Sequence, residues 1–485
     1  MQGLSQGFVL IDATLDYLSD FLVRYWGIVD VLLIAAGLII YVAASHGLHQ
    51  RRHPSAAIAW VLGMVLLPYF ALPLYLAFGS RKIVAQRAEP AAKPSATIGA
   101  GHATASRVRQ LGQAMGLPEP VTYEHLNIHV DGREALRALL HVIDSARRTL
   151  DIATFILGRD PLGDQISERL KARARDGVRV RLLIDGIGSY MGGYPDLDAL
   201  RQAGVEVLRF VPPFRSPKRG RTNLRNHRKL VIADEAHLWC GGRNLAAEYF
   251  EGDARPILGC TPWLDLSFDV TGDLVRQTRH MFEEDWAFAG EKAPPAEPPK
   301  VAAPEPNAVL AQLVASGPDR VDDTIHTLLI SACFTSQQRI LAVTPYFVPD
   351  AALMSALTLA ARRGIAIDLV LPAKSNHHLA DFVRHRAMRD LVAAGGRIWL
   401  HPQMVHAKAV VIDTELALVG SANLDGRSLF LNYEMMVAFY GRKAIGGFAR
   451  WVEARRGESV IYEPRAPGVL RDLAEGVLLW LGFQL

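Results

Sequence analysis

Hydrophobic residues near the amino terminus form two long segments. Gly27 to Ala44 contains one acidic residue near its start, and Ala56 to Phe78 contains no charged residue. At about 1.5 Å per residue, helices of these lengths approach or exceed the roughly 30 Å thickness of a bilayer's hydrocarbon core. The pattern predicts transmembrane helices near residues 27–44 and 56–78, within a membrane anchor over residues 1–82. Pro68 and Pro73 would kink the second helix without forbidding it.

Charged residues around these segments predict their orientation. Two spans place the amino terminus and the rest of the chain on one side of the membrane, and basic residues on that side outnumber those of the intervening loop. The two groups are Arg24, Arg81, Lys82, Arg87 and Lys93 against Arg51 and Arg52. The positive-inside rule therefore predicts that the chain after residue 82 lies in the cytoplasm. A cleaved signal peptide is disfavoured because Asp12, Asp16 and Asp20 stand where positive charge belongs. A buried hairpin of soluble helices is the alternative.

After residue 106 the pattern changes to short apolar runs that follow helical stretches. Two such runs recur in the same order: DGVRVRLLID from Asp176 matches RGIAIDLVLP from Arg363, and AGVEVLRF from Ala203 matches AGGRIWLH from Ala394. Strands that alternate with helices predict an α/β sheet. The repetition predicts two α/β lobes.

Composition marks the boundaries of these lobes. Residues 83–106 are rich in small residues and proline, and residues 291–307, EKAPPAEPPKVAAPEPN, are rich in proline, so both are interpreted as linkers. The first lobe is then expected over 107–290 and the second over 308–485. The final segment DLAEGVLLWLGFQL from Asp472 is interpreted as a helix that packs on the second lobe or, alternatively, lies on the membrane.

Charge and cysteine content add little to this picture, with one local exception. A formal net charge of +4 over 485 residues is too small to indicate a nucleic-acid partner, and three cysteines argue against a disulfide framework. From Phe214 to Lys229, however, basic residues accumulate without an acid. They are Arg215, Lys218, Arg219, Arg221, Arg225, Arg228 and Lys229. The stretch predicts attraction of anionic lipid head groups or, before Asn226, a merely solvated loop.

The most specific motif is His-x-Lys-x-x-x-x-Asp, which occurs twice, as HRKLVIAD and HAKAVVID. In both copies six residues separate the aspartate from a Gly-x-x-Asn, and two copies with one shared extension are not a chance match. The candidate catalytic residues are His227, Lys229, Asp234, His406, Lys408 and Asp413, and the candidate phosphate-binding amides are Asn244 and Asn423.

These residue types suit cleavage of a phosphodiester, which needs a nucleophile, a proton donor and fixed donors for the phosphoryl oxygens. One neutral histidine can attack phosphorus while the other, protonated, gives its proton to the leaving oxygen. Lysines and asparagines can hold the oxygens in place of a divalent metal. Neither motif has the acidic cluster of a magnesium or calcium site, so no metal or other cofactor is expected. Only lobes that face each other could use both histidines in one catalytic unit.

Each repeat also offers a carboxylate at the same register. Asp265 in DLSFDVTG and Glu434 in EMMVAFYG each stand seven residues before a glycine. A carboxylate can hold the proton on one imidazole nitrogen and raise the basicity of the other. The predicted pairs are Asp265 with His227 and Glu434 with His406, and the alternative is a solvated acid at a strand end.

Three further motif residues receive supporting roles. Asp234 and Asp413 end apolar strands and are interpreted as structural anchors more than as proton carriers. Ser421, beside Asn423, is predicted to add a phosphate donor, although Gly242 stands at that place in the first half.

The paired motifs resemble those of the phospholipase D superfamily and, in detail, those of the bacterial cardiolipin synthases. The strings that carry the resemblance are RNHRKLVIAD, GGRN followed by Glu248 and Tyr249, WLD from Trp263, FEEDW ending at Trp286, TPYFVPD from Thr344, and GSANLDGRSLFLNYE ending at Glu434. With the amino-terminal segments they cover nearly the whole chain. GGRNLAAEY departs peripherally from the family, which more often has an acidic residue before the glutamate.

The resemblance implies a multi-pass enzyme of the bacterial inner membrane that transfers a phosphatidyl group between two phosphatidylglycerol molecules. The products would be cardiolipin and glycerol, formed through a phosphohistidine. The resemblance favours His227 as the nucleophile, while the motifs by themselves leave the choice open. A membrane-bound phospholipase D that admits water is the alternative. Membrane spans disfavour a nuclease, and two intact motifs disfavour a non-catalytic scaffold.

Overall fold

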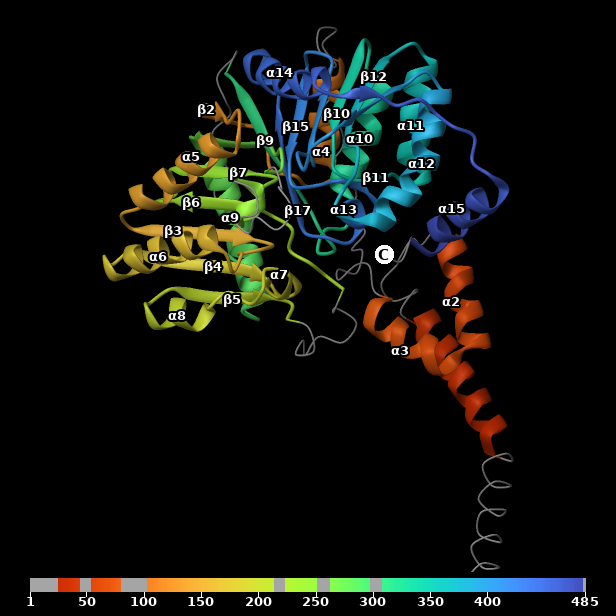
Figure 1. The fold of residues 1–485 in the computed structure, drawn as a ribbon. Helices are drawn as coiled ribbons and strands as arrows, with labels where there is room; N and C mark the ends of the chain where they lie inside the picture. The colour runs from red at the N-terminus through yellow and green to blue at the C-terminus, as the bar shows by residue number, and fades with distance from the viewer. Residues whose placement is uncertain are drawn as a thin grey trace, which may run out of the picture. The chain divides into compact units, whose positions relative to one another are not determined.

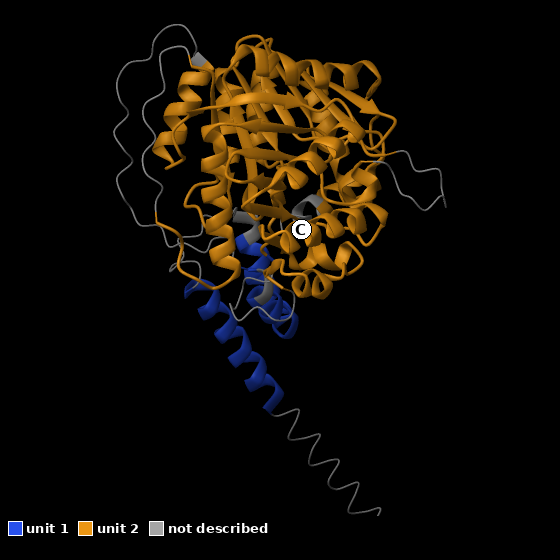
Figure 2. Cartoon of the chain, turned by 90° about the vertical axis from the view of Figure 1, so that its left-hand side faces the viewer, with its two compact units in different colours: residues 1–86, 218–223, 484 blue, residues 87–217, 224–483, 485 orange. Residues whose placement is uncertain are grey.

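The computed structural model describes residues 25–43, 54–79, 103–212, 223–250, 262–296 and 308–482. The chain divides into two compact units, which Figure 2 distinguishes by colour: residues 1–86 with 218–223 and 484, and the remainder. The described part of the smaller unit is helical, whereas the larger unit contains two extended β-sheets and their helices (Figure 1).

The smaller unit contains one candidate membrane-spanning helix among the described residues. This helix, Tyr25–Ala43, has 19 residues and is apolar enough to cross a bilayer. The following α2 (Pro54–Leu66) and α3 (Pro68–Phe78) pack on each other. Tyr75 of α3 also meets the ring of Tyr41 in the first helix, at 5.5 Å between ring centroids. The described parts of this unit thus form a small helical cluster.

The predicted second transmembrane helix near residues 56–78 is not confirmed, because α2 and α3 break at Leu67. Leu67 has φ −140° and ψ 56°, outside the helical region. Pro68 disfavours a helical conformation for the residue before it and has no N–H to continue the helical hydrogen bonds. The 13 residues of α2 extend about 20 Å at about 1.5 Å per residue, which is less than the roughly 30 Å of a hydrocarbon core.

The first lobe is built on a 7-stranded sheet in the order β2-β8-β7-β6-β3-β4-β5. Strands β3, β4 and β5 run parallel, and the other neighbours are antiparallel. The strands are β2 (Glu124–Ile128), β3 (Thr149–Thr154), β4 (Arg179–Asp185), β5 (Glu206–Phe210), β6 (Leu230–Ala233), β7 (His237–Gly241) and β8 (Ser267–Thr271).

The second lobe repeats this order as β9-β17-β15-β14-β10-β12-β13 within a 9-stranded sheet whose edge strands are β1 and β18. The strands are β1 (Val121–Thr122), β9 (Leu310–Ser316), β10 (Arg339–Val343), β12 (Ala366–Pro372), β13 (Arg397–His401), β14 (Ala409–Ile412), β15 (Leu416–Gly420), β17 (Glu434–Phe439) and β18 (Val460–Ile461). The strings matched by sequence become β4 with β12 and β5 with β13. The predicted duplicated α/β fold is therefore confirmed.

Helices cover both faces of each sheet. On one face lie α5 (Gly132–Ser145), α6 (Pro161–Arg175) and α8 (Leu197–Gln202) in the first lobe, and α10 (Thr324–Thr335), α11 (Ala351–Arg362) and α12 (His378–Ala393) in the second. On the other face, α9 (Asp273–Ala289) packs on the first sheet and contacts β9, while α14 (Arg442–Gly457) packs on the second and contacts β2. The two lobes therefore meet through α9 and α14.

The same local signals start and end equivalent helices. The carboxylate of Asp160 accepts backbone N–H groups at the start of α6, and that of Asp350 does so at the start of α11. After these helices, Gly177 and Gly364 have φ of +84° and +88°, a left-handed conformation that glycine adopts without steric cost. The repeated glycines seen in the sequence thus terminate helices and redirect the chain into β4 and β12.

The start of the first lobe differs from the predicted residue 107. Helix α4 (Ala103–Ala114) contacts α10 of the second lobe, and the Thr104 hydroxyl donates to the Thr335 carbonyl at 3.0 Å. Strand β1 pairs with β9 of the second lobe. The first-lobe sheet therefore begins at β2, after a segment that belongs to its neighbour.

The other segments expected at the boundaries are described only in part. Most of the linker at 83–106 and residues 297–307 of the proline-rich linker lie outside the described residues. The carboxyl-terminal segment forms α15 (Val469–Gly482), which contacts α12. Glu475 of α15 accepts from Arg389 of α12 at 2.5 Å, whereas Leu470 and Leu473 are exposed.

Candidate active site

Each motif leads into an equivalent strand, and its aspartate closes the turn after that strand. The Asp234 carboxylate accepts the backbone N–H groups of residues 147–149 at 2.7–2.9 Å. The Asp413 carboxylate accepts those of residues 337–339 at 2.8–2.9 Å. These bonds tie β6 to the start of β3 and β14 to the start of β10. The aspartates therefore anchor the strands that follow the histidines, which agrees with the structural role expected from the sequence.

Two short parallel pairings across the lobe boundary bring the motifs together. The His227 N–H donates to the Tyr433 carbonyl at 2.9 Å, and the Tyr433 N–H donates to the Arg225 carbonyl at 2.8 Å. In the equivalent pairing the His406 N–H donates to the Leu264 carbonyl at 2.7 Å. Each pairing therefore places a histidine beside the residue that precedes a carboxylate of the other lobe.

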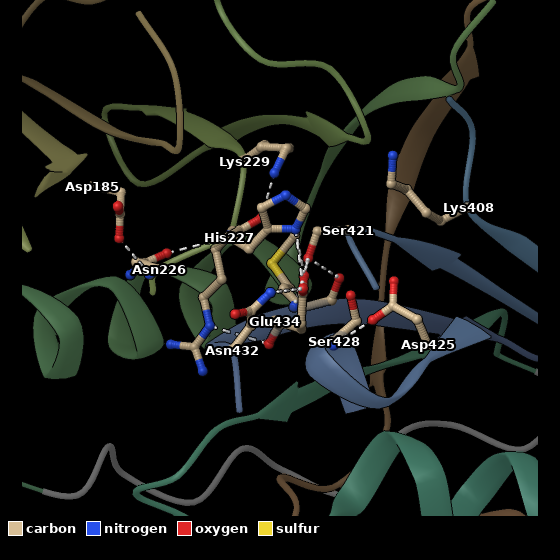
Figure 3. A network of polar contacts seen from close by, with 12 residues as sticks. Asp185, Asn226, His227, Lys229, Lys408, Ser421, Asp425, Ser428, Asn432 and Glu434 are labelled. Atoms are coloured by element: carbon tan, nitrogen blue, oxygen red, sulfur yellow. Dashed lines mark hydrogen bonds and ion pairs between the residues drawn. The ribbon is translucent and has the colours of Figure 1, made fainter. Parts of the chain in front are cut away.

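Each histidine consequently meets the carboxylate of the opposite lobe. His227 Nδ1 lies 3.0 Å from Glu434 Oε1, a pair visible in Figure 3. His406 Nδ1 lies 2.7 Å from Asp265 Oδ2. The predicted pairs, Asp265 with His227 and Glu434 with His406, are wrong because both acids stand at the lobe boundary and face across it. With Nδ1 held, Nε2 is the nitrogen left for chemistry on His227. On His406, Nε2 also lies 3.0 Å from Lys408 Nζ.

Both carboxylates are buried and ionised. Glu434 accepts the Ser421 hydroxyl at 2.5 Å and the Asn432 amide at 3.1 Å. The hydroxyl proton of Ser421 is thus directed to Glu434, and its role as a phosphate donor stays a prediction. Burial raises the pKa of Asp265, but the charges of Lys408 and His406 outweigh it and lower that pKa to about 2.

The two motif lysines are buried beside the histidines. Lys229 Nζ donates to the His227 carbonyl at 2.7 Å, and Lys408 Nζ lies 3.0 Å from His406 Nε2. Burial lowers the pKa of Lys229 to about 7 and that of Lys408 to about 8, although the nearby carboxylates oppose it. Two cations confined in this way favour the binding of an anion such as a phosphodiester.

The histidines respond to the charges of both lobes. Burial is the largest influence: it lowers the pKa of His227, and it lowers that of His406 to about 3. The charge of Lys408 also lowers the pKa of His227, and the charge of Lys229 lowers that of His406. The two motifs therefore form one electrostatic site.

The two predicted phosphate-binding amides are buried in the same region. Asn244 accepts the Ile156 N–H at 3.3 Å and donates to the Tyr249 hydroxyl at 2.8 Å. The Asn423 carbonyl oxygen is buried and has no hydrogen-bond partner among the described residues. Asn244 thus orients Tyr249, and phosphate binding by both amides stays a prediction.

Aromatic rings around the histidines were not predicted. Tyr249 and Trp263 lie 5.1 Å and 5.6 Å from His406 between ring centroids, and Phe155 lies 5.2 Å from His227. All three rings come from the first lobe. Tyr249 and Trp263 fall in strings that carry the family resemblance, but no spacing in the sequence tells which imidazole an aromatic ring meets.

The basic stretch beside His227 also differs from its prediction. Arg225, Arg228 and Lys229 are buried, so they cannot attract lipid head groups at the surface. Arg225 donates to the Val211 carbonyl at 3.0 Å, and Arg228 pairs with Asp285 at 2.5 Å. The remaining four residues lie outside the described part of the chain: Arg215, Lys218, Arg219 and Arg221.

Family models match most of the chain. The model described as "Cardiolipin synthase, PLD-like domain" matches residues 139–286 and 329–456, which fall in the two lobes. The model described as "Phospholipase_D-nuclease N-terminal" matches residues 26–80. The second match and the apolar helix Tyr25–Ala43 indicate membrane association.

Individual proteins give the same result. Cardiolipin synthase A of Pseudomonas aeruginosa (strain LESB58) is 31% identical over 463 residues, which cover 92% of this chain and 93% of that protein. Cardiolipin synthase A of Pseudomonas syringae pv. syringae (strain B728a) is 33% identical over 414 residues, covering 81% and 85%. The crystal structure of a phosphatidylserine synthase from Haemophilus influenzae Rd KW20 shares the fold, with a TM-score of 0.60 at 13% identity, and covers 78% of this chain and 100% of its own. The chain therefore belongs to the cardiolipin synthase family of the phospholipase D superfamily and is an enzyme of the phosphatidyltransferase type.

Proposed function

We propose that this cardiolipin synthase transfers the phosphatidyl group of one phosphatidylglycerol to the terminal glycerol hydroxyl of a second. The products are cardiolipin and glycerol. The reaction exchanges one phosphodiester for another, so it needs no nucleotide. Its substrates are membrane lipids, in line with the phospholipid enzymes to which the chain is related.

In the first step a neutral histidine attacks the phosphorus through Nε2. A P–N bond forms and the P–O bond to the head-group glycerol breaks, while the second histidine gives its proton to the departing oxygen. The negative phosphodiester favours that protonated form, which offsets the effect of burial on the histidine pKa. Lys229, Lys408, Asn244 and Asn423 stabilise the phosphoryl oxygens.

In the second step the roles of the second histidine reverse. Now neutral, it takes the proton of the acceptor hydroxyl, whose oxygen attacks phosphorus as the P–N bond breaks. The nucleophilic histidine is restored. Family resemblance favours His227 for this role, although each half-site offers a histidine, a lysine, an asparagine and a carboxylate.

The crossed histidine–carboxylate pairs are the observation that carries this proposal. Glu434 at His227 and Asp265 at His406 each hold Nδ1, which leaves both Nε2 atoms for one reaction. The charge of each lysine also lowers the pKa of the histidine in the other lobe. A phosphodiester bound between the lysines would therefore meet both a nucleophile and a proton donor.

The membrane arrangement is proposed from the charge pattern. The helix Tyr25–Ala43 anchors the enzyme in the bacterial inner membrane, and the apolar pair α2 and α3 provides the second pass or re-enters the same face. The basic residues after residue 80 favour a cytoplasmic catalytic unit. Labelling of single cysteines introduced near residues 10 and 95 in oriented vesicles tests this arrangement.

Lipid chromatography after incubation of the purified enzyme with phosphatidylglycerol alone tests the reaction. Cardiolipin and glycerol in equal amounts are the expected products. Phosphatidic acid and glycerol would instead identify a hydrolytic phospholipase D. Absence of any product from an enzyme that is folded and in its membrane would contradict catalysis on this lipid.

A second experiment tests the covalent intermediate and the expected independence from metal. Turnover should survive excess EDTA. Radiolabelled lipid should leave label on the protein when an acid quench is avoided, most clearly in a variant of the general acid given a substrate with a better leaving group. Activity lost in EDTA and restored by magnesium, without protein-bound label, would refute the mechanism.

A further inference from the structure

Asn226, the residue before His227, is held at three points by buried polar groups. Its backbone N–H donates to Asp185 at 2.9 Å, and its side-chain amide donates to Asp285 at 2.9 Å. Its side-chain oxygen accepts the Arg228 N–H at 3.0 Å. Asp185 ends β4 and Asp285 lies on α9, so two separate elements of the first lobe fix this one residue. Figure 3 shows Asn226 between Asp185 and the catalytic histidine.

Arg228, the residue after His227, extends this network into the second lobe. Its guanidinium donates to Asp285 at 2.5 Å and to the backbone carbonyls of Glu434 and Ser316 at 3.1 Å each. The side chain is fully buried, at 0% exposure. Arg228 therefore bonds the backbone of the same glutamate whose carboxylate holds His227.

The second lobe, as described over residues 308–482, has no equivalent of this network. In the repeat, Asn226 and Arg228 correspond to Val405 and Ala407, both fully buried. Asp185 at the end of β4 corresponds to Pro372 at the end of β12. The single acid of α14, Glu453, pairs with Arg339 at 2.7 Å, away from the motif. His406 is thus flanked by apolar residues where His227 is flanked by polar ones, one neutral and one charged.

Retention of these groups in only one lobe requires an explanation other than folding. Buried ionic groups carry a desolvation cost, and apolar packing of the same positions is often as stable. The second lobe has the same fold and has the apolar Val405 and Ala407 at the positions of Asn226 and Arg228. The difference between the lobes therefore points to a requirement at His227 that His406 does not share.

We propose that Asn226, Arg228 and Asp285 are positioning residues that set His227 against Glu434 across the lobe boundary. They touch neither the substrate nor the imidazole. They fix the backbone on both sides of His227 and the backbone of Glu434. His227 Nδ1 is therefore already positioned against the Glu434 carboxylate before substrate binds. This inference rests on the proposed role of His227 in phosphodiester chemistry.

The test removes the network and keeps the site residues. R228A/D285A deletes both charges together, so neither is left buried without its partner. N226V copies Val405 and leaves the Arg228–Asp285 pair in place. We expect both variants to fold, with kcat lower by about 10- to 100-fold and KM nearly unchanged, because a small misplacement of a reacting group slows chemistry without removing substrate contacts. R228K, which keeps the charge but not the planar fork, should recover part of the activity.

The matched control is another buried ion pair of the same lobe. Arg181 donates to Asp151 at 2.7 Å and to the more exposed Glu283 at 2.8 Å, and the side chains of Arg181 and Asp151 are about as buried as those of Arg228 and Asp285. The pair lies between β3, β4 and α9 and touches no residue of the site. R181A/D151A should lower thermal stability and leave kcat unchanged.

Glycerol release is the readout, because transfer and hydrolysis both produce it. The positioning role can thus be tested even if the products show that transfer is not the reaction. Wild-type kcat in N226V, or an equal loss of kcat in R181A/D151A, would overturn the proposal. If R228A/D285A does not fold, N226V alone decides the outcome.

Discussion

The residues that flank His227 in the chain are polar and bond a buried acid, whereas those that flank His406 are apolar. Asn226 and Arg228 flank the first histidine and engage Asp285, while Val405 and Ala407 flank the second. The motifs themselves are the same in both halves. The comparison teaches that duplication preserved the reacting groups, and that the two backbones which present them are held by different physical means.

The carboxylates add a second aspect to this comparison. Glu434 holds the histidine of the first lobe, and Asp265 holds that of the second. Neither motif histidine finds this carboxylate in its own lobe. The site therefore depends on the lobe interface, and each half-site can be damaged from either lobe.

The largest effect is expected from the histidines. H227A and H406A should each lower turnover by about 10³-fold or more, and the double variant should be scarcely worse, because the two groups act as one unit. Glycerol and cardiolipin release from purified, membrane-inserted variants measures this. Strictly additive losses in the double variant would instead show two independent sites.

The crossed arrangement predicts a specific pattern of coupling. D265N and E434Q should each lower kcat by roughly 10- to 100-fold with little change in KM, because they orient an imidazole and do not contact lipid. In double-variant cycles of thermal unfolding, D265N should couple to H406A and add independently to H227A. E434Q should show the converse. Coupling of D265N to H227A and of E434Q to H406A would instead support the pairing predicted from the sequence.

The pH dependence distinguishes the lysines from the histidines. Burial lowers the pKa of Lys229 to about 7 and of Lys408 to about 8, so both lose their protons as pH rises through this range. We expect kcat/KM to fall above pH 7 to 8, because the neutral amines bind the phosphodiester less well. The acidic limb marks protonation of the nucleophilic histidine, and burial lowers the pKa of His227, so this limb should lie below the usual histidine value of about 6.5. A kcat/KM that falls only above pH 9 would contradict the lowered pKa values of the two lysines.

The smallest effects are expected at the two anchors. D234A and D413A each leave three backbone N–H groups without their acceptor, at a cost of about 1–3 kcal/mol in the free energy of unfolding. The loss should be larger for D413A, because Asp413 is buried and Asp234 is only half-buried. Thermal unfolding measures this, and kcat of the folded fraction should be unchanged. A large fall in kcat at constant stability would assign the aspartates to the chemistry.

The repeat and its chemistry could be read from the sequence because both are local patterns. The alternation that becomes β4 and β12, the glycines that end α6 and α11, and the spacing from His227 to Asp234 are encoded within short segments. Period and turn residues suffice for such elements. The sequence therefore determined a duplicated α/β fold and the residues that could break a phosphodiester.

The partners of these residues were decided only by the tertiary structure. Register identified Asp265 and Glu434 as the carboxylates of the two histidines. Spacing cannot tell which lobe a side chain faces, however, and each acid pairs with the histidine of the other lobe. Burial of Arg225 and Arg228 likewise follows from the lobe interface, where a sequence shows only a basic run. The break at Leu67 has a local cause in Pro68, although apolar composition alone predicted one continuous span. Contacts between segments far apart in the chain depend on packing geometry, which no local pattern contains.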